Sequence, residues 1–512
     1  MSATGLLLGV DLGTSDTKVL VLRADGSRIG TWRRPTVWRR LPGQRVETEA
    51  QTLLDGVLAV IGDALTALGP ERPSVAALGL TGLAESGVVV DAAGRPRGPV
   101  IAWHDPRGAD QLARVPDAFR DAFSVTTGLP FHQQWTVAKL LWAVEHGLEL
   151  VPGSRWLNVP EYVAFALGAH PVSEPSLASR TGLLDLDTGT TWSAALDLLG
   201  VAPAFVPERR YAGQPAGVVR GDAAPAALRG ATISVAGHDH PVAAFGAGAV
   251  GSDDLFNSCG TADTLLRAIP RVVTLAERRL LTGANVEVGR HILPGTTLVN
   301  APSRAGLVLR RVLLALGASG PDATARLDAG WADADPSRAV VTGSDIEADD
   351  VVIAVREGAT PADVWAAALR HTAGHTADLL ARVAPVAGEY GRAVAAGGWL
   401  RLAGIRASKS AILPGLRFST LDQPGAFGAA VLAAWAAAGN PGTVADFAAA
   451  LRSADAAGPR TPGRTANGAG PHRAAAPANG VASHPANGVG SHPAGAPANA
   501  AGMHHSKSVL SS

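Results

Sequence analysis

The sequence is poor in cysteine and in lysine. Cys259 is its single cysteine, and only four of its 44 basic residues are lysines, namely Lys18, Lys139, Lys409 and Lys507. One cysteine cannot form a disulfide within the chain, which is compatible with a reducing compartment. A phosphate-binding loop of the type G-x-x-x-x-G-K-[ST] is excluded, because none of the four lysines has the required glycines upstream.

Charge and hydropathy exclude two classes of partner. The 44 acidic residues balance the 44 basic ones, so the surface lacks the concentrated positive field that nucleic acid or an anionic membrane needs. No run of about 18 apolar residues predicts a membrane span, and the opening stretch MSATGLLLGVDLG lacks the basic region of a signal peptide. We therefore expect a cytoplasmic protein with small-molecule substrates, no nucleic-acid partner and no membrane partner.

The apolar patterns predict an α/β fold. The segment GLLLGVDLGTSDTKVLVLR reads as two strands around a glycine-bearing turn. Residues 49–68 and 360–385 have helical spacing, and residues 425–439 form an alanine-rich helix. Strands that alternate with helices in this way are typical of an α/β core.

The chain is too long for one hydrophobic core and divides into at least two parts. An opening similar to the first one, VGSDDLFNSCGTADTLLRAI, follows Gly248, and the composition changes to Ala, Gly, Pro, Asn, Ser and His beyond Arg452. We expect one domain at residues 1–248 and a second at 249–452. The remaining residues, 453–512, should form a disordered low-complexity tail, because they offer little apolar surface to bury.

Two Gly-Thr turns, in DLGTSDTK and NSCGTADT, predict contacts with phosphate. Such a turn presents consecutive backbone N–H groups and hydroxyls, which suit phosphate oxygens. Asp11 lies at the end of the first buried strand, where a carboxylate needs a cation or hydrogen-bond donors. Mg²⁺ held through water would satisfy it.

The stretch AGHDHPVAAFGAG places Asp239 between two histidines. If ATISVAG is a strand and Pro241 the first residue of a helix, Asp239 lies at their junction, near the positive end of the helix dipole, and should be ionised at neutral pH. Adjacent residues of an extended chain point in alternating directions, so His238, Asp239 and His240 should not all bind one metal ion. A single carboxylate that accepts a proton from a substrate hydroxyl needs no such cluster.

Two weaker patterns point to other enzymes. GAGAVG, residues 246–251, has the spacing of a dinucleotide-binding loop of a dehydrogenase, but it follows a predicted helix instead of a strand. SDTK, residues 15–18, matches S-x-x-K of acyl-transferring enzymes, but the companion Lys-Thr-Gly is absent.

Taken jointly, the motifs resemble the FGGY carbohydrate kinases over about residues 5 to 440. The resemblance is carried by GVDLGTSDTK, GLTGLAESGVVVD, AWHDPR, TGLPFHQQWTVAKLLW, GHDHPVAAFGAGAV, NSCGTADTLL, AAGGWLRLAG and QPGAFGAAVLAA. It implies two ribonuclease-H-like, actin-like ATPase domains around a central cleft, with the sugar on the first and ATP on the second. The implied reaction is ATP-dependent phosphorylation of a sugar, ketose or polyol.

The resemblance also implies roles for individual residues. Asp239 would be the general base, and Asp11 would help to hold Mg²⁺. The residues implied at the nucleotide are Gly13, Thr14, Ser15, Lys18, Gly260, Thr261, Gly397 and Gly398. The residues implied at the substrate are Glu85, Trp103, Asp105, Gln134, Trp135 and His240, together with Asp239. A homodimer is common among such kinases.

The sequence departs from the family pattern at several positions. This chain has Leu83, Ala84 and Glu85 where glycerol kinases have Gln-Arg-Glu and xylulokinases have Gln-Met-His. The substrate of neither enzyme can therefore be assigned to this chain. His240 replaces a commoner Asn or Gln, Ala262 replaces Ser or Thr, and residues 330–355 lack a signature loop of the family. These departures keep open an alternative, a non-catalytic regulator that binds a sugar or a nucleotide.

Overall fold

The computed structural model describes residues 5–70, 72–220, 224–260, 262–343 and 350–457. The last described helix, α15 (Val444–Ala457), extends five residues past the predicted start of the tail at 453. The remainder of that tail, 458–512, lies outside the described residues.

The first half of the chain forms a six-stranded sheet with the order β11-β12-β6-β1-β2-β3. Strands β1, β2 and β3 are antiparallel, β6 and β12 run parallel to β1, and β11 pairs antiparallel at the edge. The bounds are β1 (Leu6–Leu12), β2 (Asp16–Arg23), β3 (Arg28–Pro35), β6 (Val75–Gly82), β11 (Gly217–Val218) and β12 (Thr232–His238).

Side chains alternate across this sheet, as the period of two in a strand requires. On β1, Leu6, Leu8 and Val10 pack into a core with α1 (Ala50–Ala67) and α5 (Val159–Ala166). Leu7 faces the other side and packs against α8 (Asp239–Gly246) and α14 (Pro424–Ala437). Asp11 shares that second face, so the register of β1 points its carboxylate toward the start of α14.

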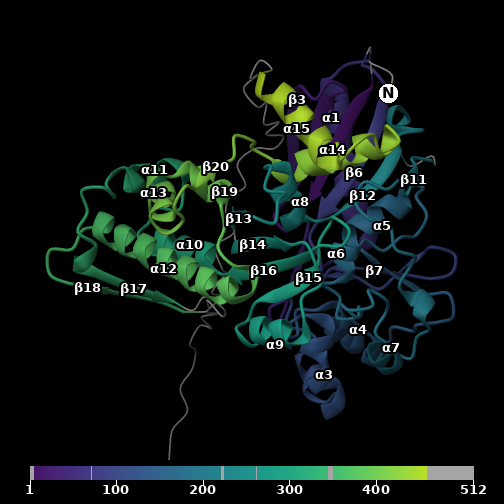
Figure 1. Ribbon diagram of the computed structural model, residues 1–512, viewed down its shortest axis with the longest axis horizontal. Coiled ribbons are helices and arrows are strands. Elements are labelled where there is room, and N and C mark those ends of the chain that lie inside the picture. Colours follow the sequence, from purple (N-terminus) through teal and green to yellow (C-terminus); the bar gives the residue numbers. More distant parts are fainter. Residues whose placement is uncertain (1–4, 71, 221–223, 261, 344–349, 458–512) are drawn as a thin grey trace, which may run out of the picture. The chain divides into compact units, whose positions relative to one another are not determined.

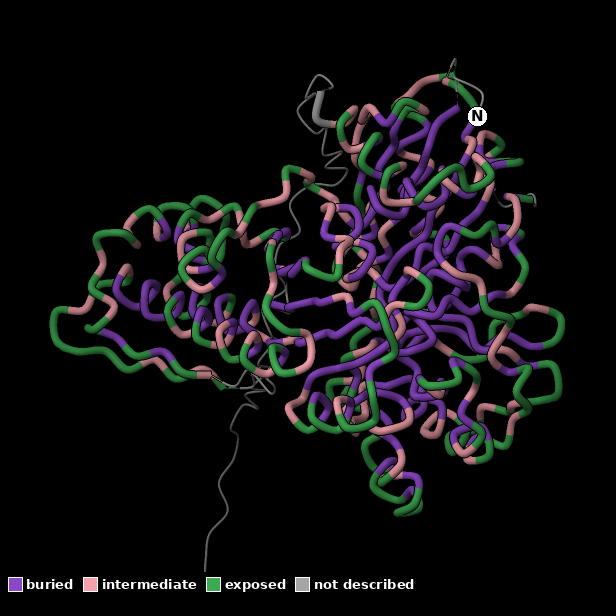
Figure 2. The backbone as a smooth tube through the Cα atoms, in the orientation of Figure 1, coloured by how far each residue is buried: buried purple, intermediate pink, exposed green. Residues whose placement is uncertain are grey.

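The second half builds a sheet of the same topology, with the order β15-β16-β14-β13-β19-β20. Its three antiparallel strands and two parallel additions repeat β1, β2, β3, β6 and β12 of the first sheet. The bounds are β13 (Asp254–Cys259), β14 (Asp263–Ile269), β15 (Glu287–Arg290), β16 (Thr297–Ser303), β19 (Arg392–Ala396) and β20 (Arg417–Phe418). Its cores include α9 (Leu275–Gly283), α10 (Ala305–Ala315), α12 (Pro361–Ala387) and α13 (Ala403–Ile412). This repeat confirms the expected pair of α/β domains, and buried residues follow the strands of both sheets in Figure 2.

One helix of the second predicted domain packs with the first sheet. Helix α14 was expected within 249–452, yet it lies in the core of the first sheet, beside the strands at the start of the chain (Figure 1). A Cβ on Gly9 would come within 1.8 Å of the Ala426 carbonyl oxygen, and one on Gly79 within 1.9 Å of the Ala429 oxygen. Glycines on β1 and β6 therefore let the backbone of α14 approach the sheet directly.

Shorter elements surround the two sheets. In the first half these are β4 (Arg39–Leu41), β5 (Arg45–Thr48), β7 (Gly87–Val90), β8 (Pro96–Arg97), β9 (Val100–Ile101), β10 (Arg155–Asn158), α2 (Ala109–Ala113), α3 (Asp117–Thr127), α4 (Thr136–Glu145), α6 (Pro175–Ala178) and α7 (Ser193–Leu199). In the second half they are α11 (Pro321–Ala329) and the hairpin of β17 (Ala339–Gly343) and β18 (Val351–Val355). Four short 3₁₀ turns are described, η1 (Pro203–Phe205), η2 (Ala226–Leu228), η3 (Pro336–Arg338) and η4 (Gly398–Arg401).

Helix α1 confirms the predicted helix at residues 49–68. It is long and apolar enough to cross a membrane by length and composition alone. Its buried residues, however, pack into the core beneath the first sheet. We interpret it as a core helix, since such helices in globular proteins meet the same criterion.

Candidate active site

Asp239 lies where a parallel strand of the first sheet becomes a helix. Strand β12 ends at His238, and α8 begins at Asp239, two residues earlier than the predicted start at Pro241. Pro241 is tolerated in the first helical turn, where backbone N–H groups have no partner within the helix. The predicted position of Asp239 at the junction is therefore confirmed. Its side chain is 30% exposed.

Burial and charge act in opposite directions on this carboxyl group. Burial raises the pKa of Asp239 above its usual value, nearby His240 lowers it, Asp11 raises it and Lys18 lowers it. The end of β1 and helix α8 adjoin the same turn of α14, because a Cβ on Gly425 would lie 3.4 Å from Asp11 Oδ2 and 4.0 Å from Ala243 Cβ. A carboxylate with a raised pKa is a better proton acceptor near neutral pH than an ordinary aspartate.

Asp11 and Lys18 form an ion pair at the first Gly-Thr turn. They are register partners on β1 and β2, and Lys18 Nζ lies 3.4 Å from Asp11 Oδ2. The pKa of Lys18 is raised, and the Asp11 carboxylate is the main cause. A Cβ built on Gly425 would lie 3.4 Å from Asp11 Oδ2, so the first turn of α14 closes one side of the carboxylate.

The first Gly-Thr turn is held by the indole N–H groups of two tryptophans. The Gly13 amide donates to the Asp16 carbonyl at 3.1 Å, and Trp38 Nε1 donates to the Thr14 carbonyl at 2.7 Å. Trp103, expected near the substrate, donates from Nε1 to the Thr14 hydroxyl at 3.0 Å. Because that hydroxyl accepts from Trp103, its own proton is directed to another acceptor, and a phosphate oxygen would suit it. Ser15 at the tip of the turn is exposed.

The second Gly-Thr turn lies between β13 and β14, against the glycines that follow β19. The Gly260 amide donates to the Ala262 carbonyl at 2.9 Å, and Thr261 lies outside the described residues. A Cβ on Gly397 would come within 2.1 Å of the Cys259 carbonyl oxygen, whereas one on Gly398 would meet nothing within 4 Å. The structure thus brings Gly397 together with this turn and leaves the surface at Gly398 open.

A buried lysine supports the second turn and was missed as a site residue. Lys409 on α13 donates to the Asp263 carboxylate on β14 and to Thr376 Oγ1 on α12. Asn257 Nδ2 donates to the other oxygen of Asp263 at 2.6 Å. These residues are all at most 5% exposed. The sequence signals them only through the scarcity of lysine.

The expected substrate residues Glu85, Gln134 and Trp135 meet around Arg180, which the sequence analysis also missed. Arg180 Nε donates to Glu85 Oε1 at 2.7 Å, and its guanidinium lies 4.9 Å from the centre of the Trp135 ring. Arg180 also pairs with Glu287, to which Gln134 Nε2 donates at 3.4 Å. Since Glu287 belongs to β15 of the second sheet, this network joins the two halves of the chain.

Asp105 does not present a free carboxylate, contrary to its expected place among the substrate residues. It is 1% exposed, and its oxygens accept from the Val46 amide at 2.6 Å and from the Arg107 guanidinium at 2.8 and 2.7 Å. A substrate hydroxyl could bond to it only if these bonds broke. Asp105 therefore positions the segment that carries Trp103.

Lys139 supports the same segment. Its Nζ donates to the Trp103 carbonyl at 3.1 Å and to the carbonyls of Gln133 and Gln134. Burial lowers the pKa of Lys139 to about 8, opposed by the carboxylates of Glu85 and Asp105. The predicted substrate residues Trp103 and Gln134 are thus tied to each other through one buried ammonium group.

The expectation that His238, Asp239 and His240 diverge is wrong. One ligand atom from each of the three lies within 4.8 Å of the other two. The strand ends at His238, so the alternation of an extended chain stops before the third residue and the helical turn brings His240 back beside Asp239. His240, an expected substrate residue, is half-buried there.

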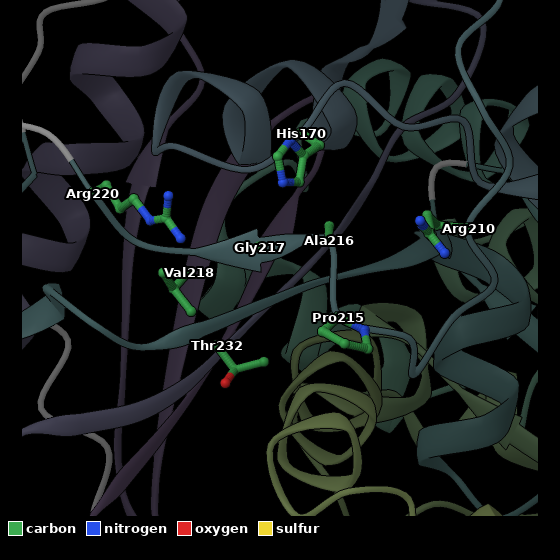
Figure 3. A pocket seen from close by; sticks show the side chains of 8 residues that line it. All are labelled: His170, Arg210, Pro215, Ala216, Gly217, Val218, Arg220 and Thr232. Atoms are coloured by element: carbon green, nitrogen blue, oxygen red, sulfur yellow. The ribbon is translucent and has the colours of Figure 1, made fainter.

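A pocket of about 300 Å³ lies elsewhere, beside the edge strand β11 (Figure 3). It is lined by His170, Arg210, Pro215, Ala216, Gly217, Val218, Arg220 and Thr232. None of the predicted site residues lines it. We therefore place the candidate active site at Asp239, on the chemistry of its side chains.

Comparisons with known proteins agree with this architecture. Residues 6–246 match the N-terminal domain of the FGGY family of carbohydrate kinases. A glycerol kinase from Trichlorobacter lovleyi is 28% identical, and the match covers 55% of this chain and 58% of that protein. A xylulose kinase from Streptomyces coelicolor is 27% identical over 48% of this chain and 50% of its own length. The chain thus matches only about half the length of these curated relatives.

Solved structures extend the likeness of fold over most of the described chain. The xylulose kinase from Rhodospirillum rubrum has a TM-score of 0.71 at 22% identity, covering 88% of this chain and 98% of that one. Plasmodium falciparum glycerol kinase with ADP has a TM-score of 0.74 at 15% identity, covering 88% and 92%. The part of the chain at residues 6–246 therefore belongs to the FGGY family of carbohydrate kinases, and the rest of the described chain shares the fold of these kinases.

Proposed function

We propose that this protein transfers the γ-phosphoryl group of ATP to a hydroxyl of a small sugar, ketose or polyol, with Asp239 as the general base. One observation carries the proposal. A partly exposed carboxylate with a raised pKa begins α8 near the Asp11–Lys18 pair, beside a turn with free hydrogen-bonding capacity. The acceptor hydroxyl and the phosphate donor would therefore meet at one place.

The residues at the first turn fit a nucleotide bound with Mg²⁺. Asp11 offers a half-buried carboxylate oxygen, the ligand type that Mg²⁺ prefers, either directly or through water. When bound, Mg²⁺ would offset the negative charge of the phosphates, which is its usual role in phosphoryl transfer. The turn at Gly260 and the surface at Gly397 and Gly398 would make the second contact with the nucleotide.

The side chains of this protein would mainly align the reactants and move one proton. Asp239 would accept the proton of the substrate hydroxyl as that oxygen attacks the phosphorus, while the Thr14 hydroxyl and backbone amides of the turn donate to phosphate oxygens. Phosphoryl transfer needs little covalent help from the protein, so positioning and charge supply most of the catalysis.

The opposite side of the site would recognise the sugar. Gln134 and His240 offer polar atoms to hydroxyl groups, and Trp103 and Trp135 offer apolar rings. Glu85 is already paired with Arg180, so a hydroxyl at that point must share its carboxylate. Ala84, Ala262 and the missing signature loop keep open the alternative of a non-catalytic sugar-binding or nucleotide-binding regulator, which must be tested against the kinase.

A substrate panel distinguishes the two. The full chain is incubated with ATP and Mg²⁺ and with ketoses, aldonates or polyols in turn, and ADP release is measured. A kinase releases ADP only when its acceptor is present, whereas a regulator binds without releasing it. ADP release that is the same with and without every acceptor would contradict the proposal.

The Asp239→Asn variant tests the role of the base. We expect kcat to fall by about 10²- to 10⁴-fold, the range for a positioned general base, while ATP still binds in calorimetry. Asp117→Asn is the matched control, because Asp117 also begins a helix, α3, but is exposed. Near-normal turnover of the Asp239 variant would remove Asp239 from this role.

A further inference from the structure

His238, Asp239 and His240 converge on one carboxylate oxygen. His238 Nε2 lies 3.2 Å from Asp239 Oδ1, and His240 Nε2 lies 4.0 Å from the same oxygen. Two ligands at about 2.1 Å from a tetrahedral ion stand roughly 3.4 Å apart. The two separations from Oδ1 bracket that value, and all three ligand atoms lie within 4.8 Å of one another. Closing the triad around an ion therefore needs side-chain shifts of about 1 Å.

The hydrogen bonding of this triad is incomplete among the described residues. Asp239 Oδ1 is buried and accepts no hydrogen bond, and the Nδ1 atoms of His238 and His240 are buried without a partner. The whole His238 residue is only 4% exposed. Buried polar atoms normally find partners, and leaving one unpaired costs about 1–3 kcal/mol. The unpaired atom that bears on a ligand is Asp239 Oδ1, because both Nε2 atoms converge on it. The two Nδ1 atoms lie on the other side of their rings, so an ion bound through Nε2 would not pair them.

We propose that His238, Asp239 and His240 form a site for a divalent transition-metal ion such as Zn²⁺. Two imidazole nitrogens and one carboxylate oxygen are ligands that Zn²⁺ accepts in proteins, whereas Mg²⁺ and Ca²⁺ select oxygen. Three protein ligands leave a fourth position for water or for an oxygen of the substrate. The site is therefore distinct in chemistry from the Mg²⁺ site expected at Asp11.

The consequence for activity rests on the proposed function. A metal ion on Asp239 Oδ1 occupies the electron pair that would accept the proton of the substrate hydroxyl. Zn²⁺ would therefore inhibit a kinase that uses Asp239 as its base, and a chelator would restore the rate. His240 supplies the second imidazole, so it would make this chain sensitive to the metal.

Binding is tested separately from activity. Co²⁺, whose visible absorption reports the ligands around it, is titrated into the full chain without nucleotide or sugar, and Zn²⁺ affinity is measured by displacement. The variants His240→Asn and His240→Gln each remove one ligand and keep a polar side chain. His170→Asn is the matched control, because this exposed histidine lies at the pocket near β11. Histidines of residues 458–512 are retained in every variant, so their contribution cancels.

The wild type and the His170 control should bind one more Co²⁺ than the His240 variants. If the stoichiometry is the same, they should bind Co²⁺ more than about 100-fold more tightly, because loss of an outer-shell contact costs at most about 100-fold in affinity. Equal stoichiometry, affinity and absorption in all four proteins would overturn the site. Circular dichroism establishes that each variant is folded, and agreement between the two His240 variants excludes an effect of one side chain.

Inhibition then separates the two proposals. Zn²⁺ is added to the kinase assay and the rate is expressed relative to the metal-free rate of the same variant. Inhibition that weakens by the same factor as binding in the His240 variants supports both the site and the base. Zn²⁺ bound at the triad without inhibition supports the site and contradicts Asp239 as the base. Inhibition of equal strength in all variants, with no difference in binding, overturns the site and leaves the base untouched.

Discussion

The two sheets share five strands in the same order, and each carries a Gly-Thr turn after its first strand, but their charges are arranged differently. In the first half, Asp11 and Lys18 face each other at 3.4 Å with 13% and 26% of their side chains exposed. In the second half, the side chains of Asp263 and Lys409 are 7% and 5% exposed. One topology thus provides backbone amides twice, while it presents accessible charge at the first turn and buries charge behind the second.

The largest expected effect of this difference is on stability. Lys409→Met leaves the buried Asp263 carboxylate without its cation, and breaking such a pair costs about 3–5 kcal/mol. Lys18→Met removes the partner of a more exposed carboxylate, which costs about 1 kcal/mol or less. Urea unfolding of the two variants measures both costs.

The same two variants should reverse their order in activity. Lys18→Met is expected to lower kcat/KM by about tenfold, because contacts with charged groups contribute about 1.5 kcal/mol or more. Lys409→Met should keep its kcat at temperatures where it remains folded. Equal losses of stability in both variants would contradict the interpretation that charge is accessible at the first turn and buried behind the second.

How far the sequence anticipates this arrangement depends on the range of the contacts. Strand β1 and helix α1 can be predicted from local periodicity. The position of Asp239 can be predicted too, because the apolar pattern changes there from that of a strand to that of a helix. Helix α14 could not be assigned to a sheet, because it is apolar on nearly every face and therefore carries no directional pattern. Its contacts with Gly9 and Gly79 join residues that are far apart in the sequence, so no local pattern predicts them.

The candidate site shows the same limit. The turns at Gly13 and Gly260 could be predicted, since Gly-Thr motifs are local. Arg180 and Glu287 could not, because the two are 107 residues apart and no local pattern marks either one. The convergence of His238 and His240 depends on the residue at which the strand ends, and helix boundaries are the least certain part of a sequence-based prediction.

A second expected effect concerns the buried acids behind Asp239. Glu174 accepts a hydrogen bond from the Ser176 hydroxyl at 2.5 Å, and that hydroxyl oxygen accepts from the His238 amide at 2.9 Å. Burial raises the pKa of Glu174 to about 8 and that of nearby Glu161 to about 7. Glu174 thus holds the end of β12 in its protonated form.

The sign of the pH dependence follows from these values. Above the ordinary glutamate pKa the unfolded chain releases its proton while the folded protein keeps it, so the free energy of unfolding falls as pH rises toward about 8. One such group contributes up to about 1.4 kcal/mol per pH unit in this window. Glu174→Gln should reduce that slope in urea unfolding between pH 5 and pH 8. The exposed control Glu149→Gln should leave it unchanged, and an unchanged slope in the Glu174 variant would show that the group ionises freely.

The last comparison is between the two glycines beside the second turn. Gly397 has φ of +136° and no room for a Cβ against the Cys259 carbonyl, so Gly397→Ala should cost about 1–3 kcal/mol through strain. Gly398 has open space around it. Gly398→Ala should change stability by less than about 0.5 kcal/mol.

If the second turn receives the nucleotide, Gly398→Ala should still raise KM for ATP. The added methyl group stands on the surface where adenosine is expected to lie, so contact is lost in the ground state and the transition state alike, and kcat should stay the same. Steady-state kinetics with varied ATP measure this, and KM for the sugar serves as the internal control. An increase confined to the sugar KM would move the nucleotide away from β19. Because a Cβ on Gly398 would meet no atom within 4 Å, a change in KM for ATP in this variant reports binding and not stability.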